Sequence, residues 1–174
     1  AKSATFKDHA FVFVHGFNTS FDYALYRTAQ IAYDLGYDDP VRGHIPFGTA
    51  FLYSWPSGGR TQDYLYDGDS ARLAAAQVKR FVELVTAQSG AKQVHLIAHS
   101  MGNLALLNAL KDVKSLPGGA RVNQVVLAAP DIDVGEFEEL AQAIVPLARN
   151  VTLYASSKDV AMIAARQARR NAPR

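Results

Sequence analysis

The sequence predicts a three-layer α/β/α sandwich built on a mostly parallel, doubly wound sheet. Short apolar runs, typical of strands buried on both faces, alternate about five times with longer stretches of helical periodicity along the 174 residues. No linker and no internal repeat interrupts that alternation. Because strands that alternate with helices form a parallel sheet covered on both faces, we expect one domain of this class over residues 1–174.

Strands and helices are assigned from apolar periodicity and from turn residues. The expected strands are Ala10–Val14, Ala50–Trp55, Gln93–Ala98, Val122–Ala129 and Asn150–Ala155. The expected helices run from a Thr19 or Ser20 cap to about Leu35, from Asp67 or Asp69 to Gly90, over Met101–Val113, over Val134–Leu147, and onward from about Lys158. Asp38–Gly48 is expected to be a surface loop, because it contains Pro40, Gly43 and Pro46. The doubly wound connection predicts the spatial strand order second, first, third, fourth, fifth.

Composition excludes several classes of function. The net charge of +2 is too small to indicate nucleic-acid binding, and the absence of cysteine excludes disulfides and thiolate chemistry. No apolar run is long enough to span a membrane. No signal peptide is visible and the given sequence does not begin with Met, so we expect a processed or excised fragment and leave the compartment open.

The turn after the third strand carries the main functional signal. Ala98-His99-Ser100-Met101-Gly102 matches the nucleophile elbow G-x-S-x-G, with Ala in place of the first Gly. In such a turn the residues two positions from the serine must be small, and the helix N-terminus after it stabilises negative charge. The alternative is an ordinary serine N-cap. The apolar strand before the turn and the buried helix after it favour a nucleophile at Ser100.

The loop after the first strand, His15-Gly16-Phe17-Asn18, is expected to lie beside that elbow. The predicted strand order makes the first and third strands neighbours at the switch point, where ligands bind in this class of sheet. The N–H groups of Phe17 and Met101 then become a candidate oxyanion hole. A helix-entry loop with Gly for turn geometry is the alternative.

Six motifs together resemble one family. They are VFVHGFN, YSWPSGG, YLYDGDSA, LIAHSMGN, LAAPDID and YASSKD, and they are similar to an uncharacterised bacterial branch of the α/β-hydrolase superfamily, known only as a domain of unknown function. The resemblance runs from Ala10 to Arg166. It implies a serine hydrolase that cleaves a small-molecule ester, thioester or amide through an acyl-enzyme, without a cofactor.

The superfamily triad runs Ser, then Asp or Glu, then His. Asp159, after the fifth strand, is the favoured acid, and Asp131 and Asp133, after the fourth strand, are the alternatives. None of the five histidines follows Asp159. We therefore expect the general base and one more strand to be absent from this chain, with His44 as the remaining candidate. His95 and His99 have the i, i+4 spacing of a metal pair, but with no nearby carboxylate we expect no metal site.

The expected substrate pocket combines His15, Asn18 and His99 with Trp55 and Tyr66, which border the loop Pro56–Tyr66. Core packing is the alternative for the two aromatic residues. Two other functions stay open: a catalytically inactive pseudo-hydrolase that binds or scaffolds, and a flavodoxin-like nucleotide-binding domain, for which the phosphate loop is absent. An unpaired edge at Asn150–Ala155 would favour self-association.

Overall fold

The computed structural model describes residues 6–155. Its main sheet has five parallel strands in the order β4-β1-β5-β6-β7, which confirms the predicted order and the predicted fold class. The strands are β1 (His9–Val14), β4 (Thr49–Tyr53), β5 (Gln93–His99), β6 (Arg121–Ala128) and β7 (Ala148–Tyr154). The first and third predicted strands, β1 and β5, pair over their whole length, so the turns that follow them leave the same edge of the sheet side by side.

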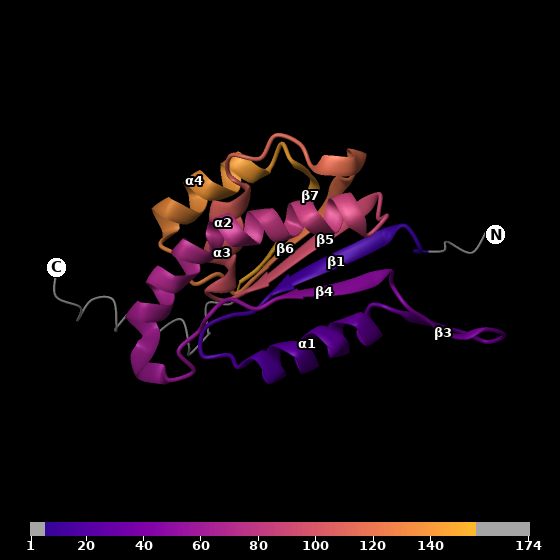
Figure 1. The fold of residues 1–174 in the computed structure, drawn as a ribbon, viewed down its shortest axis with the longest axis horizontal. Helices are drawn as coiled ribbons and strands as arrows, with labels where there is room; N and C mark the ends of the chain where they lie inside the picture. The colour runs from indigo at the N-terminus through magenta and orange to yellow at the C-terminus, as the bar shows by residue number, and fades with distance from the viewer. Residues whose placement is uncertain (1–5, 156–174) are drawn as a thin grey trace.

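The helices lie on both faces of this sheet (Figure 1). Helix α1 (Phe21–Asp34) covers one face, and α2 (Tyr64–Gln88), α3 (Gly102–Leu110) and α4 (Val134–Ile144) cover the other. Short 3-10 turns, η1 (Thr61–Asp63) and η2 (Pro117–Gly119), connect these elements. Doubly wound sheets gather the loops at the carboxyl ends of their strands, and these loops form the site.

The core lies mainly between the sheet and the group of three helices. Ala10, Val12 and Val14 of β1 belong to it, and so do alternate residues of β5, because side chains alternate across a strand. Helix α3 is buried almost all round, as its apolar sequence predicts. The rigid strand-to-helix connection at Ser100 is therefore anchored on both sides by buried elements.

The helix ends follow the predicted capping residues. The Ser20 side chain accepts a hydrogen bond from the Tyr23 N–H and caps α1. Helix α2 ends at Gln88, and Gly90 follows at φ +74°, the left-handed conformation that terminates helices. Helix α4 ends at Ile144, just before Pro146, which could not continue it.

Two of the predicted elements are wrong in detail. The expected loop Asp38–Gly48 contains an antiparallel hairpin of β2 (Tyr37–Asp39) and β3 (Gly43–Ile45). The Asp39 carboxylate accepts hydrogen bonds from the N–H groups of Val41 and Arg42 and so stabilises the turn. The sequence did not indicate these strands, because three residues are too few to show an alternation of apolar and polar side chains. Helix α2 begins at Tyr64, one turn before the predicted start. The helix expected from Lys158 lies outside the described residues.

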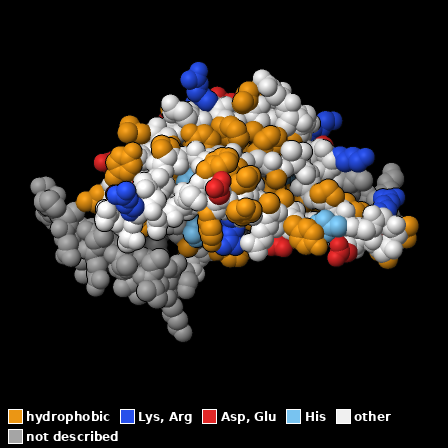
Figure 2. Space-filling model, turned by 60° about the horizontal axis from the view of Figure 1, so that its bottom comes forward, with side chains coloured by type: hydrophobic (Ala, Val, Ile, Leu, Met, Phe, Trp, Pro, Cys, Tyr) orange, Lys and Arg blue, Asp and Glu red, His pale blue; other side chains and the backbone are white. Residues whose placement is uncertain are grey.

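The exposed surface over α1 is rich in apolar side chains (Figure 2). Phe21, Tyr23, Leu25, Tyr26 and Tyr33 are all exposed on this helix. No helix among residues 6–155 is long and apolar enough to cross a membrane. Within the same range β7 pairs with β6 alone, and its Leu153 and Tyr154 are exposed.

Candidate active site

Ser100 occupies a strained turn between β5 and α3. Its φ is +51°, a conformation that costs a non-glycine residue energy and that clusters at functional sites. The Ser100 N–H donates to the carbonyl of Ala128 at the end of β6, over 2.9 Å, which holds the turn against the neighbouring strand. The local geometry is therefore that of a nucleophile elbow and not of an extended N-cap residue, which takes a β-region backbone.

The small residues around Ser100 are required by the packing. A Cβ on Gly102 would lie 2.3 Å from the His15 carbonyl oxygen and 2.7 Å from that of Val14, both of which are backbone atoms. A Cβ on Gly16 would lie 2.8 Å from the Cβ of Ser100 and 2.9 Å from Nδ1 of His99. The loop after β1 and the elbow after β5 are thus in direct contact.

Phe17 and Met101 directly follow Gly16 and Ser100, the two residues in contact, in the chain. Within the described residues, the N–H groups of Phe17 and Met101 have no hydrogen-bond acceptor. Met101 is buried, and Phe17 is half-buried with its ring set edge-on against Tyr64 at 5.3 Å. Unpaired backbone N–H groups are rare in protein interiors, and they are what an oxyanion hole needs.

Asn103 braces the elbow. Its side chain is fully buried, and its Nδ2 donates to the carbonyls of Ser100, over 2.7 Å, and Ala128, over 3.1 Å. The Asp131 N–H also donates to the Ser100 carbonyl, over 3.3 Å. Three segments therefore hold the Ser100 peptide in place. Sequence analysis missed Asn103, although it stands directly after the elbow in the motif LIAHSMGN.

His15 is buried, and both of its ring nitrogens have hydrogen-bond partners. Its Nδ1 pairs with the Gly16 carbonyl at 2.9 Å and its Nε2 with the Ser54 hydroxyl at 3.1 Å, while its ring stacks on Trp55. Burial lowers the pKa of His15 below its ordinary value, although hydrogen bonds and the charge of Asp67 act in the opposite direction. Both ring nitrogens are engaged, so His15 shapes the loop.

A cavity of about 680 Å³ opens between α1 and the sheet next to this loop. His15, Asn18 and His99, three residues of the expected pocket, line it together with Phe17. Its remaining wall is largely apolar. The other two expected residues lie elsewhere: Trp55 packs in the core, with its Nε1 donating to the His15 carbonyl over 2.7 Å, and Tyr66 is exposed in the first turn of α2.

A second cavity, of about 420 Å³, lies on the other side of the elbow, beneath the start of α2. Met101, Tyr64 and Asp131 line it. Ser100 itself lines neither cavity, but its neighbour His99 lines the larger one and its neighbour Met101 lines the smaller one.

The candidate acids have different surroundings. Asp131 is buried, and both of its carboxylate oxygens accept from the Tyr64 hydroxyl, at 2.9 and 2.8 Å. Asp133 caps α4, since its carboxylate accepts from the N–H groups of Gly135 and Glu136. Asp159 lies outside the described residues.

The remaining histidines lie away from the elbow. His9 Nδ1 and His95 Nε2 are 3.0 Å apart at the start of the sheet, and burial, followed by the neighbouring His9, lowers the pKa of His95 to about 4. His44 stacks on Tyr33 and pairs with Asp38 at 2.9 Å in the β2-β3 hairpin, at the far end of the sheet (Figure 1). No metal-binding cluster of His, Asp or Glu occurs among residues 6–155.

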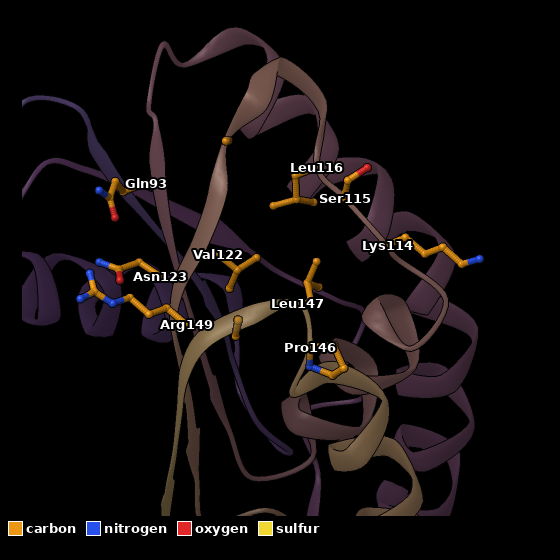
Figure 3. A pocket seen from close by; sticks show the side chains of 11 residues that line it. Gln93, Lys114, Ser115, Leu116, Val122, Asn123, Pro146, Leu147 and Arg149 are labelled. Carbon is orange, nitrogen blue, oxygen red and sulfur yellow. The ribbon is translucent and has the colours of Figure 1, made fainter.

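A third cavity, of about 430 Å³, lies at the opposite end of the sheet, where β5, β6 and β7 begin (Figure 3). Leu116, Val122 and Leu147 project toward its middle, while the Lys114 side chain points away from it. The whole length of the sheet separates it from Ser100, so it is not part of this site.

Sequence analysis also missed Asp67, which it took for the start of a helix. Asp67 is fully buried in the first turns of α2, and it accepts hydrogen bonds from the loop 15–18 after β1 and from the loop 56–60 after β4. The only sequence signal is an acidic residue between aromatic and small ones in the motif YLYDGDSA.

A strained serine between a parallel strand and a helix, packed against a glycine loop from the adjacent strand, defines the α/β-hydrolase class. The chain belongs to the family described as alpha/beta hydrolase of unknown function (DUF900), whose model matches residues 2–174. This confirms the resemblance to the α/β-hydrolase superfamily drawn from the six motifs. No curated protein matches the chain.

Proposed function

We propose that this protein is a serine hydrolase that cleaves an ester, thioester or amide through an acyl-enzyme on Ser100. One observation carries the proposal. The strained Ser100, at φ +51°, lies in contact with the Gly16 loop, and the two backbone amides next to it, of Phe17 and Met101, have no acceptor within the described residues. A nucleophile beside two free donors is the arrangement that acyl transfer requires.

The chemistry assigned to these groups is a two-step transfer. Ser100 Oγ bonds to the carbonyl carbon, and the electron pair of the C=O bond moves to the oxygen, which accepts from Phe17 and Met101 N–H. A general base takes the serine proton and delivers it to the leaving group as the bond to that group breaks. Water then attacks the acyl-enzyme in the same way and releases Ser100.

We assign the base to a histidine oriented by Asp159, in line with the chain order of the superfamily triad. The contacts of His15, His44 and the His9–His95 pair support this assignment, because each of these rings already has a structural partner. No histidine follows Asp159 within the 174 residues, so the proposal leaves the base unassigned among them.

The 680 Å³ cavity is the proposed acyl site. Phe13, Ile31 and Ile97 contribute an apolar wall, and its volume lies in the range that holds small organic ligands. The leaving group would then lie on the side of the smaller cavity, near Tyr64 and Met101. This arrangement favours esters and thioesters of apolar acids.

The second candidate function is a pseudo-hydrolase that uses the same cavities for binding. The contacts of His15 favour it, since both ring nitrogens of this histidine already have hydrogen-bond partners. The two functions differ in one measurable property, the reactivity of Ser100.

A fluorophosphonate probe tests that reactivity on the full-length protein. We expect labelling of the wild type and of Ser115→Ala, which changes a serine at the opposite end of the sheet, and no labelling of Ser100→Ala. Ser100→Ala that is labelled like the wild type would overturn the assignment. A folded wild type that binds acyl ligands without being labelled would support the pseudo-hydrolase.

A further inference from the structure

We propose that Asp67 is a positioning residue for the oxyanion hole, and this rests on the proposed function. Its carboxylate joins the oxyanion loop, residues 15–18, to the glycine loop, residues 56–60. Both loops lack regular secondary structure, and residue 56 lies 38 positions after residue 18 in the sequence. The side chain that connects them comes from a third segment, the first turns of α2.

Three hydrogen bonds define the connection. Asp67 Oδ2 accepts from the Ser57 hydroxyl at 2.5 Å and from the Asn18 N–H at 3.5 Å, and Asp67 Oδ1 accepts from the Gly58 N–H at 2.7 Å. The carboxylate has no exposed surface. All three partners approach as donors, so the ionised acid, which only accepts, suits the site.

The fold favours a negative charge at this point. Asp67 is the fourth residue of α2, where the free N–H groups of the first turn create a positive potential. A buried carboxylate is costly unless it is hydrogen-bonded, and here each oxygen has a short partner. The loops and the helix therefore depend on one another: the donors stabilise the charge, and the charge holds the donors in place.

The consequence for catalysis passes through the peptide that follows Phe17. Its N–H, which belongs to Asn18, points to Asp67, and its carbonyl accepts from the Thr19 hydroxyl at 3.0 Å. Asn18 has φ +52°, a conformation that needs support from its surroundings. Fixing both ends of this peptide fixes the direction of the neighbouring Phe17 N–H, the proposed oxyanion donor.

The glycine loop is packed for the same contact. A Cβ on Gly58 would lie 2.5 Å from Asp63 Oδ2 and 2.8 Å from Asp63 Cβ, so glycine lets this backbone pack against the turn η1 that precedes α2. At the base of the loop, the His15–Ser54 pair and the bond from Trp55 to the His15 carbonyl form a second connection. The hydrogen bonds of Asp67 therefore hold the two loops together further along the chain, at Ser57, Gly58 and Asn18.

The test compares Asp67→Asn with Val78→Ala in the full-length protein. Val78 is buried on the same helix eleven residues after Asp67, so its truncation should lower stability away from the hydrogen bonds of Asp67. For Asp67→Asn we expect kcat and the fluorophosphonate labelling rate to fall by about 10- to 100-fold with KM nearly unchanged, because oxyanion contacts act in the transition state. Val78→Ala should lower the melting temperature and leave both rates near wild type.

Hydrogen exchange gives a readout that needs no activity. Asp67→Asn should exchange faster than the wild type in residues 15–20 and 56–60, and Val78→Ala should not. Ser57→Ala removes one donor and retains the Asp67 charge, so it should lower the rates and speed hydrogen exchange to a smaller degree. This variant replaces Asp67→Asn in the test if Asp67→Asn fails to fold. Wild-type kinetics and wild-type exchange in Ser57→Ala and Asp67→Asn would overturn this inference, whereas absence of labelling in the wild type would overturn the proposed function.

Discussion

The Cα of Gly16 faces the side chain of Ser100 so closely that a Cβ on Gly16 would lie 2.8 Å from the Cβ of Ser100. Two loops from adjacent parallel strands meet at this point, one with the candidate nucleophile and one with a candidate oxyanion donor. The free space between them is less than one methyl group. The geometry of the site therefore depends on the absence of a single side chain.

Gly16→Ala should separate the two loops. The added methyl group also meets His99 Nδ1 at 2.9 Å and the His99 carbonyl at 3.0 Å, so the loop has to move as a whole. We expect ester turnover to fall by about 100-fold, the effect of a misplacement near 1 Å, and the free energy of unfolding to fall by about 1–3 kcal/mol from overpacking. The control is Gly135→Ala in α4, whose Cβ would meet an atom only at 3.4 Å. Equal ester turnover by Gly16→Ala and Gly135→Ala would show that the close contact between Gly16 and Ser100 does not matter for activity.

The three candidate acids can be separated by amide substitutions in the full-length protein. Asp159→Asn should reduce kcat by about 10⁴-fold, as loss of the triad acid does. Asp133→Asn should leave activity and stability near wild type, because Asn caps a helix as well as Asp does. A large loss of kcat in Asp131→Asn together with a mild Asp159→Asn would instead place the acid after β6, next to the Ser100 peptide.

The position of the base can be tested by chain length. On p-nitrophenyl acetate, the 174-residue chain should be nearly inactive, since an unassisted serine is a poor nucleophile, although an oxyanion hole alone can leave about 10³-fold over water. A chain extended through the next strand should be active in a Ser100-dependent manner. Equal Ser100-dependent rates for the two chains would show that a base lies within these residues.

Narrowing the larger cavity should change acyl preference. Ile97 lines it from β5, and Ile97→Trp should fill part of its volume, so that the preferred acyl chain in a series of p-nitrophenyl esters becomes shorter. Replacing the loop from Trp55 to Tyr66 tests the competing prediction that this segment sets acyl preference. If the preferred acyl chain length changes with the loop replacement and stays the same in Ile97→Trp, the acyl group binds on the side of α2.

Stability should depend on pH through His95. Its folded pKa of about 4 is below the ordinary value of 6.5, so between these values the unfolded chain binds a proton that the folded chain does not. The stability that neutral His95 provides is therefore complete above about pH 6.5 and is lost as the pH falls toward 4. Urea unfolding between pH 4.5 and 7 should show a steeper dependence for the wild type than for His95→Gln.

The sequence by itself determined the alternation of strands and helices, the strand order and the position of the elbow. These features depend on residue types close together in the chain: apolar runs, capping residues, and small residues two positions from Ser100. The meeting of the oxyanion loop with the elbow also followed from the sequence, because parallel strands leave the same edge of a sheet.

The tertiary structure alone decided which groups surround the site. It paired the Asp67 carboxylate with Ser57, Gly58 and Asn18, the last of them 49 residues away, and it engaged both nitrogens of His15. It also showed that Trp55 packs in the core, the alternative to the expected place in the pocket wall. Contacts of this kind depend on how segments distant in sequence pack against one another, and the residue types near each position do not encode that packing.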